Sequence, residues 1–377
     1  MKLNLTKRQR IFWIVLFSSI AVALCAILLL EIGRGRVAKS LPDQLAAERW
    51  GEDSVQMSVF FAADRPYSVS AIQGVSRQIE SALTDASLEA KGQGRLWFHA
   101  YSTERETYIE TSRATFTVTA TLIGGDYFYV HTPDLVSGAP LTDDAAGDGA
   151  VFLDETAAFA LFGAVDVAGS TVQVDGISYT VAGVFRVPEN RFYDGYGKTP
   201  RIYLTYSSAF GRNVSDVTVW EAVLPEPVEG FARGTVRKVF DGYKDSAVTV
   251  ENSARFSIPA LWEITLRRDT LGVRTSSITY PWFENVARVA EYKASSYLLW
   301  EIVFASVALV GVIVLIGALW HPTERALSRL KTAAGEKRDD LWEYMTIPAV
   351  RAAKKKGKTK PPRKAADKRS FYKKETL

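Results

Sequence analysis

Two long apolar runs constrain this chain more than any other feature. The first, Ile11 to Leu30, has no charged residue over 20 positions, and the second, Leu298 to Trp320, carries only Glu301 over 23 positions. An α-helix rises about 1.5 Å per residue, so either run can cross a hydrocarbon core about 30 Å thick. The sequence therefore predicts a membrane protein with two transmembrane helices.

A cleaved signal peptide is the main alternative for the first run. Such a peptide has an apolar core of about 7 to 15 residues followed by a small-x-small cleavage site, and neither feature is present. Cys25 suggests a lipoprotein signal, but Leu24 precedes it where a small residue is expected, and the apolar stretch continues past it. We therefore interpret the run as an uncleaved anchor and assign the two membrane helices to residues 11–32 and 298–320.

Basic residues predict the orientation, since Lys and Arg accumulate on the cytoplasmic side of a membrane. The first ten residues carry four basic side chains and no acid, and the segment after Trp320 carries 17 Lys and Arg against 7 Asp and Glu. Because the whole chain has a net charge of only +4, the part between these basic ends is acidic. We expect both termini, residues 1–10 and 321–377, to be cytoplasmic and residues 33–297 to lie outside the cell membrane.

The basic tail, residues 321–377, could be taken for a nucleic-acid-binding segment. Anionic lipid explains it more simply, because each basic residue close to a bilayer contributes about 1 kcal/mol of attraction. We therefore predict membrane lipid, and no nucleic acid, as its partner. Residues 340–350 are mildly amphipathic and suit the interface, whereas the Lys-rich stretch around Lys354 to Lys364 has few apolar residues and is predicted to be disordered.

Cysteine and histidine are too scarce for common metal chemistry. The only cysteine, Cys25, lies in the first apolar run, so the outer domain has no disulfide and depends on a packed core. The only histidines are His99, His131 and His321, and no H-E-x-x-H pair is present. Zinc chemistry is therefore not expected.

The other motifs of catalysis and ligand binding are also absent. There is no G-x-x-x-x-G-K-[ST] loop to hold a nucleotide phosphate and no G-x-S-x-G nucleophile elbow. Asp143, Asp144 and Asp148 form an acidic turn that could bind calcium, but it lacks the bidentate Glu of a calcium loop, so a solvated loop is preferred. We predict no catalytic, cofactor-binding or metal-binding residues, no cofactor and no enzyme activity.

Between the spans, the residue pattern predicts an α+β domain. A strand at 55–61, a helix at 68–89 capped by Ser68 or Ser70, and a strand at 95–101 form one β-α-β unit. A strand at 219–224, a helix at 228–240 and a strand at 246–250 form a second. Between them, residues of about 124–215 are punctuated by Gly and Asp and predict an inserted, mostly-β lobe with one short helix, Glu155 to Phe162. The expected fold is thus two β-α-β units with a separate β-rich lobe, held between two transmembrane helices.

A family resemblance rests on an ordered series of short blocks in this insertion. They are D-Y-F from Asp126, L-V-S-G-x-P-L from Leu135, A-V-F-L-D-E-T-A-A-F-A-L-F-G from Ala150, and V-A-G-S-T-V-Q-V-D-G-x-x-Y-T-V-A-G-V-F from Val167. This series resembles the periplasmic core domain of MacB-type and FtsX-like ABC permeases. The resemblance spans Asp126 to Val187 closely and the β-α-β frame loosely.

The resemblance implies partners, because this chain has no nucleotide-binding loop of its own. Family members usually have four membrane helices, with three after the outer domain, whereas this sequence has one there. We therefore expect an ABC ATPase subunit and a second permease-like subunit beside it. Residues 280–297 have apolar positions at helical spacing and predict a stalk helix continuous with the second span.

Two functions remain open from the sequence. The first is a non-catalytic permease-type or accessory subunit that couples a partner ATPase to the outer domain. The second is a two-span receptor whose outer domain senses a ligand, although the tail shows no recognisable output domain. The aromatic stretch Tyr193 to Tyr206 could form a ligand surface, since exposed loops often carry function, but core packing and turns explain most of it.

Overall fold

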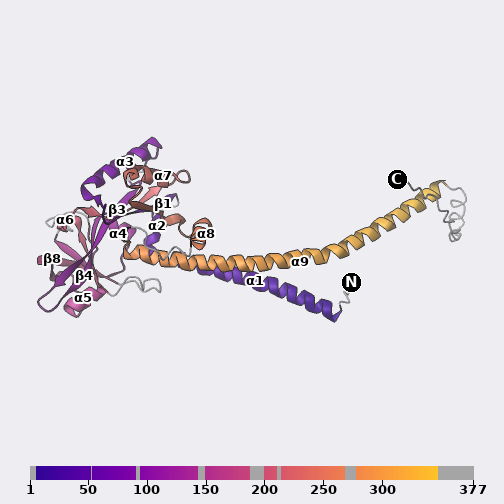
Figure 1. Cartoon of the computed structure of the whole chain (residues 1–377), viewed down its shortest axis with the longest axis horizontal. Coiled ribbons are helices and arrows are strands. Elements are labelled where there is room, and N and C mark those ends of the chain that lie inside the picture. Colours follow the sequence, from indigo (N-terminus) through magenta and orange to yellow (C-terminus); the bar gives the residue numbers. More distant parts are fainter. Residues whose placement is uncertain are drawn as a thin grey trace, which may run out of the picture. The chain divides into compact units, whose positions relative to one another are not determined.

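A computed structural model gives the fold of the chain and describes residues 6–51, 53–90, 94–142, 149–186, 199–209, 214–267 and 277–346 (Figure 1). They divide into two compact units. The larger comprises residues 23–305, and the smaller comprises the described parts of 1–22 and 306–377.

The larger unit is a mixed α+β domain with the inner ends of two long helices. The helices of the chain are α1 (Lys7–Lys39), α2 (Ala46–Trp50), α3 (Ile72–Asp85), α4 (Tyr127–Val130), α5 (Glu155–Phe162), α6 (Tyr206–Ala209), α7 (Phe231–Val239), α8 (Ile258–Leu266) and α9 (Trp282–Thr346). The strands are β1 (Ser54–Phe61), β2 (Tyr67–Ser68), β3 (Phe98–Glu110), β4 (Thr115–Gly125), β5 (Leu135–Gly138), β6 (Ala150–Asp154), β7 (Thr171–Val174), β8 (Ile177–Phe185), β9 (Arg201–Thr205), β10 (Asp216–Val217), β11 (Val219–Pro225) and β12 (Ala247–Glu251). Short 3₁₀ turns lie at Pro42–Gln44, Val69–Ala71, Asp241–Tyr243 and Asn252–Ala254.

One 10-stranded sheet organises the domain. Its main path has the order β12-β1-β11-β3-β4-β9-β6-β8-β5, and β7 joins β3 to β8. The four strands β12-β1-β11-β3 pair antiparallel, and with α3 and α7 they form a split β-α-β arrangement. Parallel pairs occur only further along, at β4 with β9 and β6 with β8 among the described strands.

Helices cover both faces of this four-strand part. On one face lie α3 and α7 (Figure 1), which pack Val75, Ile79 and Val236 onto Met57 and Trp220 in the main core. On the other face a second cluster joins α2 and α4 to β3 and β11. A third cluster joins α8 and the first turns of α9 to β1 and β11. The start of α9 is therefore part of the hydrophobic core.

The inserted residues do not form a separate lobe, which corrects the expectation from the sequence. The hairpin of β3 and β4 pairs residue for residue from Ala100↔Gly125 to Glu110↔Thr115, and β4 then pairs with β9 of the insertion. Ten strands consequently make one continuous sheet. Strand β3 is longer than predicted because its second half, from Ser102, is largely polar and shows no apolar alternation.

Of the two helices predicted for these regions, α3 has different ends from those expected, whereas α5 has the expected ends. Helix α3 is shorter than residues 68–89, and the residue that precedes it is Ala71, so neither Ser68 nor Ser70 caps it. Helix α5 has the predicted bounds, with the carboxylate of Asp154 accepting from the backbone N–H of Ala157. Gly163 ends α5 in the left-handed conformation at φ 73°, which glycine adopts readily at the end of a helix.

Two glycines in the short sequence blocks quoted above allow β5 and β8 to approach closely. Gly138 in β5 faces Gly183 in β8. A Cβ added at Gly183 would lie 2.6 Å from the carbonyl oxygen of Ser137, and one added at Gly138 would meet the backbone of Ala182. Because neither glycine has a side chain, the two backbones can pack directly on one another.

Helices α1 and α9 are both long and apolar enough to cross a membrane. In the smaller unit, Gly311 of α9 lies against Leu16 and Ile20 of α1, and an added Cβ would come within 2.6 Å of Ile20 Cγ1. Helix α9 continues from the stalk segment, residues 282–297, through the apolar run to Thr346, so the predicted continuity of stalk and span is confirmed. It also includes residues 340–346 of the amphipathic stretch, whereas residues 347–377 lie outside the described residues.

Candidate functional site

A buried histidine bridges two carboxylates on the face of the sheet opposite α3 and α7. Nδ1 of His131 lies 2.9 Å from Oδ1 of Asp43, and Nε2 lies 2.6 Å from Oε2 of Glu221. Burial lowers the pKa of His131, but the charge of Glu221 and hydrogen bonds to both carboxylates outweigh burial and raise the pKa to about 9. At neutral pH the ring is therefore an imidazolium that donates to both partners.

This His131 bridge (Asp43, His131 and Glu221) joins three separate segments. Asp43 lies in the 3₁₀ turn that follows α1, His131 directly follows α4, and Glu221 lies in the central strand β11. Ser58 of β1, opposite Glu221 in the sheet, donates to Oε1 of Glu221 over 2.9 Å. Asn252 in turn donates to the Ser58 hydroxyl over 2.7 Å. The buried carboxylate is thus held on both of its oxygens, as a buried charge requires.

Further contacts connect the bridge to both long helices. Nε2 of Gln56 donates to the carbonyl oxygen of Asp43 over 2.7 Å, and Oε1 of Gln56 accepts from the backbone of Ala46. These bonds fasten the segment after α1 to β1. On the other side, the ring of Phe283, in the first turn of α9, lies 4.3 Å from the His131 ring between centroids. The bridge therefore contacts the start of α9 and the segment that leaves α1.

A second buried cluster fixes the stalk segment to the edge of the sheet. Nη2 of Arg255 donates to Oε2 of Glu284 over 2.6 Å, and Nε lies 3.0 Å from Oε1 of Glu291. Nε of Arg288 donates to Oε1 of Glu284 over 2.7 Å. Burial raises the pKa of Glu291 to about 7, although Arg255 opposes this shift. We call these four residues the Arg255 cluster; a hollow of about 430 Å³ adjoins it.

A third contact joins α1 directly to α9, near the outer ends of the two apolar runs. Nε of Arg34 lies 3.5 Å from Oε1 of Glu301, and Arg34 also pairs with Glu31. One turn further out, the ring of Tyr297 covers Gly33, where an added Cβ would be in ordinary contact at 3.5 Å. The two helices are therefore linked to each other as well as to the sheet.

These contacts join the sheet to the two long helices, and we call the His131 bridge, the Arg255 cluster and the Arg34 contact together the junction. The two ring nitrogens of His131 bind different carboxylates, so the carboxylates do not converge on one point where an ion could sit. Within the described ranges, no group of three or more His, Cys, Asp and Glu side chains is arranged to hold a metal. Breaking a buried ion pair by removing one partner typically costs about 3–5 kcal/mol, so these contacts hold the starts of both helices firmly to the sheet.

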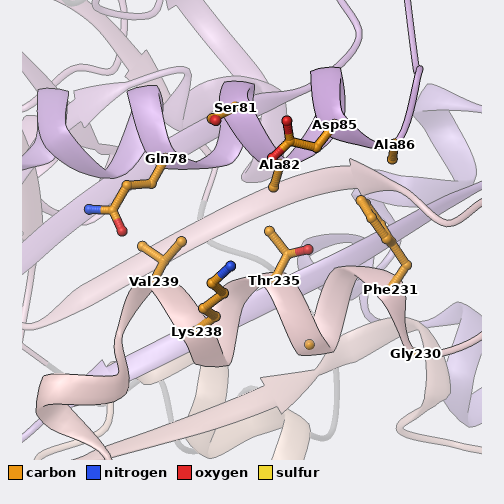
Figure 2. A pocket seen from close by; sticks show the side chains of 11 residues that line it. Gln78, Ser81, Ala82, Asp85, Ala86, Gly230, Phe231, Thr235, Lys238 and Val239 are labelled. Carbon is orange, nitrogen blue, oxygen red and sulfur yellow. The ribbon is translucent and has the colours of Figure 1, made fainter.

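Another hollow lies between α3 and α7 (Figure 2). It has a volume of about 660 Å³, and small side chains make up much of its lining. Asp85 projects from α3, while Thr235 and Lys238 project from α7 toward it (Figure 2). Its lining combines small, apolar and polar side chains, and it shares no lining residue with the His131 bridge or the Arg255 cluster.

The structure places the residues discussed from the sequence in different environments. His99 lies 3.2 Å from the Ser76 hydroxyl, away from the bridge, and burial lowers its pKa to about 4, so its ring is neutral. The side chain of His321 is outside the described ones. Part of the aromatic stretch, Arg201–Thr205, is the buried strand β9 and belongs to the core. The acidic turn of Asp143, Asp144 and Asp148, residues 193–198 and the Lys-rich tail lie outside the described residues.

The junction residues were not identified as a site from the sequence. Asp43 is 88 residues from His131, and Glu221 is 90 residues from it, so no local spacing unites them. One usable signal existed: Glu221 interrupts the otherwise apolar strand VWEAVL, and a charge in a buried strand needs a partner.

Comparison with known proteins identifies the family. The family model described as "MacB-like periplasmic core domain" matches residues 35–230, just over half of the chain. The chain belongs to this family, which confirms the resemblance drawn from its motifs. No curated protein sequence matches the chain significantly.

Solved structures with low sequence identity are similar to parts of the chain. The periplasmic region of MacB from Actinobacillus actinomycetemcomitans is 18% identical, with 58% of this chain and 94% of that chain covered and a TM-score of 0.38. The extracellular domain of the noncanonic ABC-type transporter YknZ from Gram-positive bacteria is 16% identical, with 52% and 99% covered and a TM-score of 0.37. A domain of a putative permease protein from Porphyromonas gingivalis is 13% identical, with 53% and 89% covered and a TM-score of 0.31.

The chain is thus a membrane protein in which two apolar helices flank a MacB-like periplasmic domain. Such domains occur in permease-like proteins of ABC-type transporters, a family that in general works with an ATPase.

Proposed function

We propose that this chain is a non-catalytic, permease-type subunit of an ABC mechanotransmission complex, in which a partner ATPase moves the outer domain. One observation carries the proposal: α9 is a single helix from Trp282, within the core, through the apolar run to Thr346. In this proposal the helix moves as one body. Because the Arg255 cluster holds its first turns to the sheet, movement of the span is passed to the domain.

The topology of this subunit follows from charge. The basic segments, residues 1–10 and 321–377, lie in the cytoplasm, residues 11–32 and 298–320 cross the cell membrane, and residues 33–297 lie outside. The excess of Lys and Arg after Trp320 supports this orientation. The same basic tail lies on anionic lipid at the inner surface.

Two partners complete the complex in this proposal: an ABC ATPase subunit and a second permease-like subunit. The absence of a nucleotide-binding loop from the sequence supports the first. The resemblance to permeases that usually have four membrane helices supports the second, since two helices of this chain are apolar and long enough to span.

Crosslinking in native membranes, followed by affinity purification and mass spectrometry, tests the proposal. We expect an ABC ATPase and a permease-like protein to be recovered with the tagged chain, and purified chain alone to hydrolyse no ATP. Recovery of a signalling kinase with no ABC component would overturn the proposal and favour the alternative, a two-span sensor. ATP hydrolysis by the purified chain alone would show that the motor is not a separate subunit.

A further inference from the structure

Helix α8 has an apolar stripe that the domain does not cover. Ile258, Trp262 and Leu266 follow one another at intervals of four residues and are 57%, 42% and 68% exposed. The helix is attached through a different side, where Leu261 is fully buried and Ile264 packs in the cluster that includes the first turns of α9. The exposed stripe is therefore a second apolar face.

The position of α8 places this face at the level of lipid headgroups. Nη1 of Arg34 donates to the carbonyl oxygen of Phe256 over 3.4 Å, and Phe256 lies two residues before α8. Arg34 lies four residues beyond Leu30, the end of the first apolar run, which corresponds to about 6 Å along the helix. The headgroup region of a bilayer is about as thick as this on each side of the hydrocarbon core. Figure 1 accordingly shows α8 beside the part of α9 that leaves the domain.

The chemistry of α8 matches such a position. Trp prefers the boundary between hydrocarbon and water, and Trp300 of α9 is likewise exposed at the outer end of the second apolar run. Next to the apolar stripe, Arg267 and Glu263 form an exposed ion pair of 2.7 Å, which provides a polar side for water. The exposed apolar surface of α9 at Leu299 and Ile302 belongs to the same region.

We propose that α8 is an interfacial helix that rests on the outer leaflet of the membrane, with Ile258, Trp262 and Leu266 inserted among the lipids. Contact with lipid there fixes the height of the domain above the membrane. Because α8 packs on the start of α9, the leaflet also supports the stalk segment. This contact is separate from the basic tail and is made whether or not an ATPase partner exists.

Lipid quenching of site-specific labels tests this contact. In a Cys25→Ser background of the full chain, Ile258→Cys and Leu266→Cys variants are labelled with a fluorophore and placed in phosphatidylcholine nanodiscs. Two matched controls are Glu263→Cys, on the polar side of α8, and Phe159→Cys, an exposed apolar position on α5. We expect nitroxide-labelled lipid to quench the labels at 258 and 266 severalfold more than the label at 159, and aqueous iodide to quench them severalfold less.

Equal quenching at 258, 266 and 159 by both agents would overturn the proposal. Shielding from iodide that appears only in native membranes, and not in nanodiscs of the chain alone, would also overturn it, since a protein partner would then cover the stripe. Because the substituted side chains are exposed, the fold is retained, which unchanged melting temperatures of the variants confirm.

Discussion

Nη2 of Arg255 donates a hydrogen bond of 2.6 Å to Oε2 of Glu284, and this contact joins the edge of the sheet to the helix that enters the membrane. Arg255 directly follows the 3₁₀ turn after β12, and Glu284 lies in the first turn of α9. Both side chains are 1% exposed. The pair is therefore shielded from water and from screening by salt.

Removal of the Arg255 guanidinium is expected to destabilise the domain strongly. Arg255→Met leaves Glu284 and Glu291 buried without their shared partner, a change that costs about 3–5 kcal/mol in comparable sites. Arg267→Met is the matched control, since it breaks an exposed ion pair with Glu263, and an exposed pair contributes at most about 1 kcal/mol. Denaturant unfolding in detergent measures the loss of stability in both variants. Similar unfolding midpoints for the two would show that the Arg255 cluster does not hold the stalk segment.

The His131 bridge predicts a stability that falls as the solution becomes alkaline. The folded-state pKa of about 9 lies above the ordinary value of about 6.5 for an unfolded chain. The stabilisation by the charged ring is thus fully present below pH 6.5 and is lost as the pH rises through 9. This difference corresponds to about 3 kcal/mol.

Thermal unfolding of the wild type and of His131→Gln, measured at intervals from pH 6 to pH 10, tests this pH dependence. The wild type should lose stability as the pH rises through 9, whereas the variant, which lacks the ring at position 131, should be less stable at pH 6 and should not show this loss near pH 9. Parallel curves for the two proteins would show that His131 does not carry the charge in the folded state.

Two glycines with nearly the same backbone angle predict different tolerance of alanine. Gly138 has φ 72° and Gly163 has φ 73°, so either substitution costs about 1–2 kcal/mol for a left-handed residue. At Gly163 an added Cβ meets nothing within 4 Å, whereas at Gly138 it meets the backbone of Ala182 and Gly183. Gly138→Ala should therefore lower the melting temperature clearly more than Gly163→Ala. Equal losses would exclude the close approach of β5 and β8.

Local features of this fold could be predicted because their causes lie close together in the sequence. Helix α5 has a capping Asp154 before it and Gly163 after it, and the two apolar runs depend on composition alone. The continuity of α9 follows from apolar residues at helical spacing before Leu298. Each of these predictions used only one continuous stretch of neighbouring residues, over which helix propensity, capping and hydrophobicity act.

The single sheet and the junction could not be predicted in this way. Strand β3 continues past Tyr101 through polar residues because its partners β4 and β7 supply the hydrogen bonds, and pairing, rather than side-chain pattern, sets its length. The Asp43 and Glu221 carboxylates are 88 and 90 residues from His131, and the tertiary fold brings them together. Such long-range polar contacts leave no periodic signal, so the absence of a sequence motif does not exclude a built site.

Cysteine labelling tests the proposed orientation of the chain. In the Cys25→Ser background, Val228→Cys, which is exposed on the domain, should react with a membrane-impermeant maleimide added to intact cells. Ser370→Cys, in the basic tail, should react only after the membrane is permeabilised. Labelling of position 370 in intact cells would place the tail outside and contradict the orientation inferred from its charge.

A proline in the stalk segment tests whether α9 carries motion to the domain. Lys293 is exposed on α9, between Glu291 of the Arg255 cluster and Leu298, where the apolar run begins. Lys293→Pro removes one helical hydrogen bond and kinks the helix, at a cost of about 3 kcal/mol, whereas Lys293→Ala preserves it. In membranes that contain the whole complex, the labelling rate of Val228→Cys should change when ATP is added to the wild-type and alanine chains. The Lys293→Pro chain should assemble with its partners but lose this ATP response, because the kinked helix no longer passes movement of the span to the sheet. An unchanged response would show that motion reaches the domain by another route.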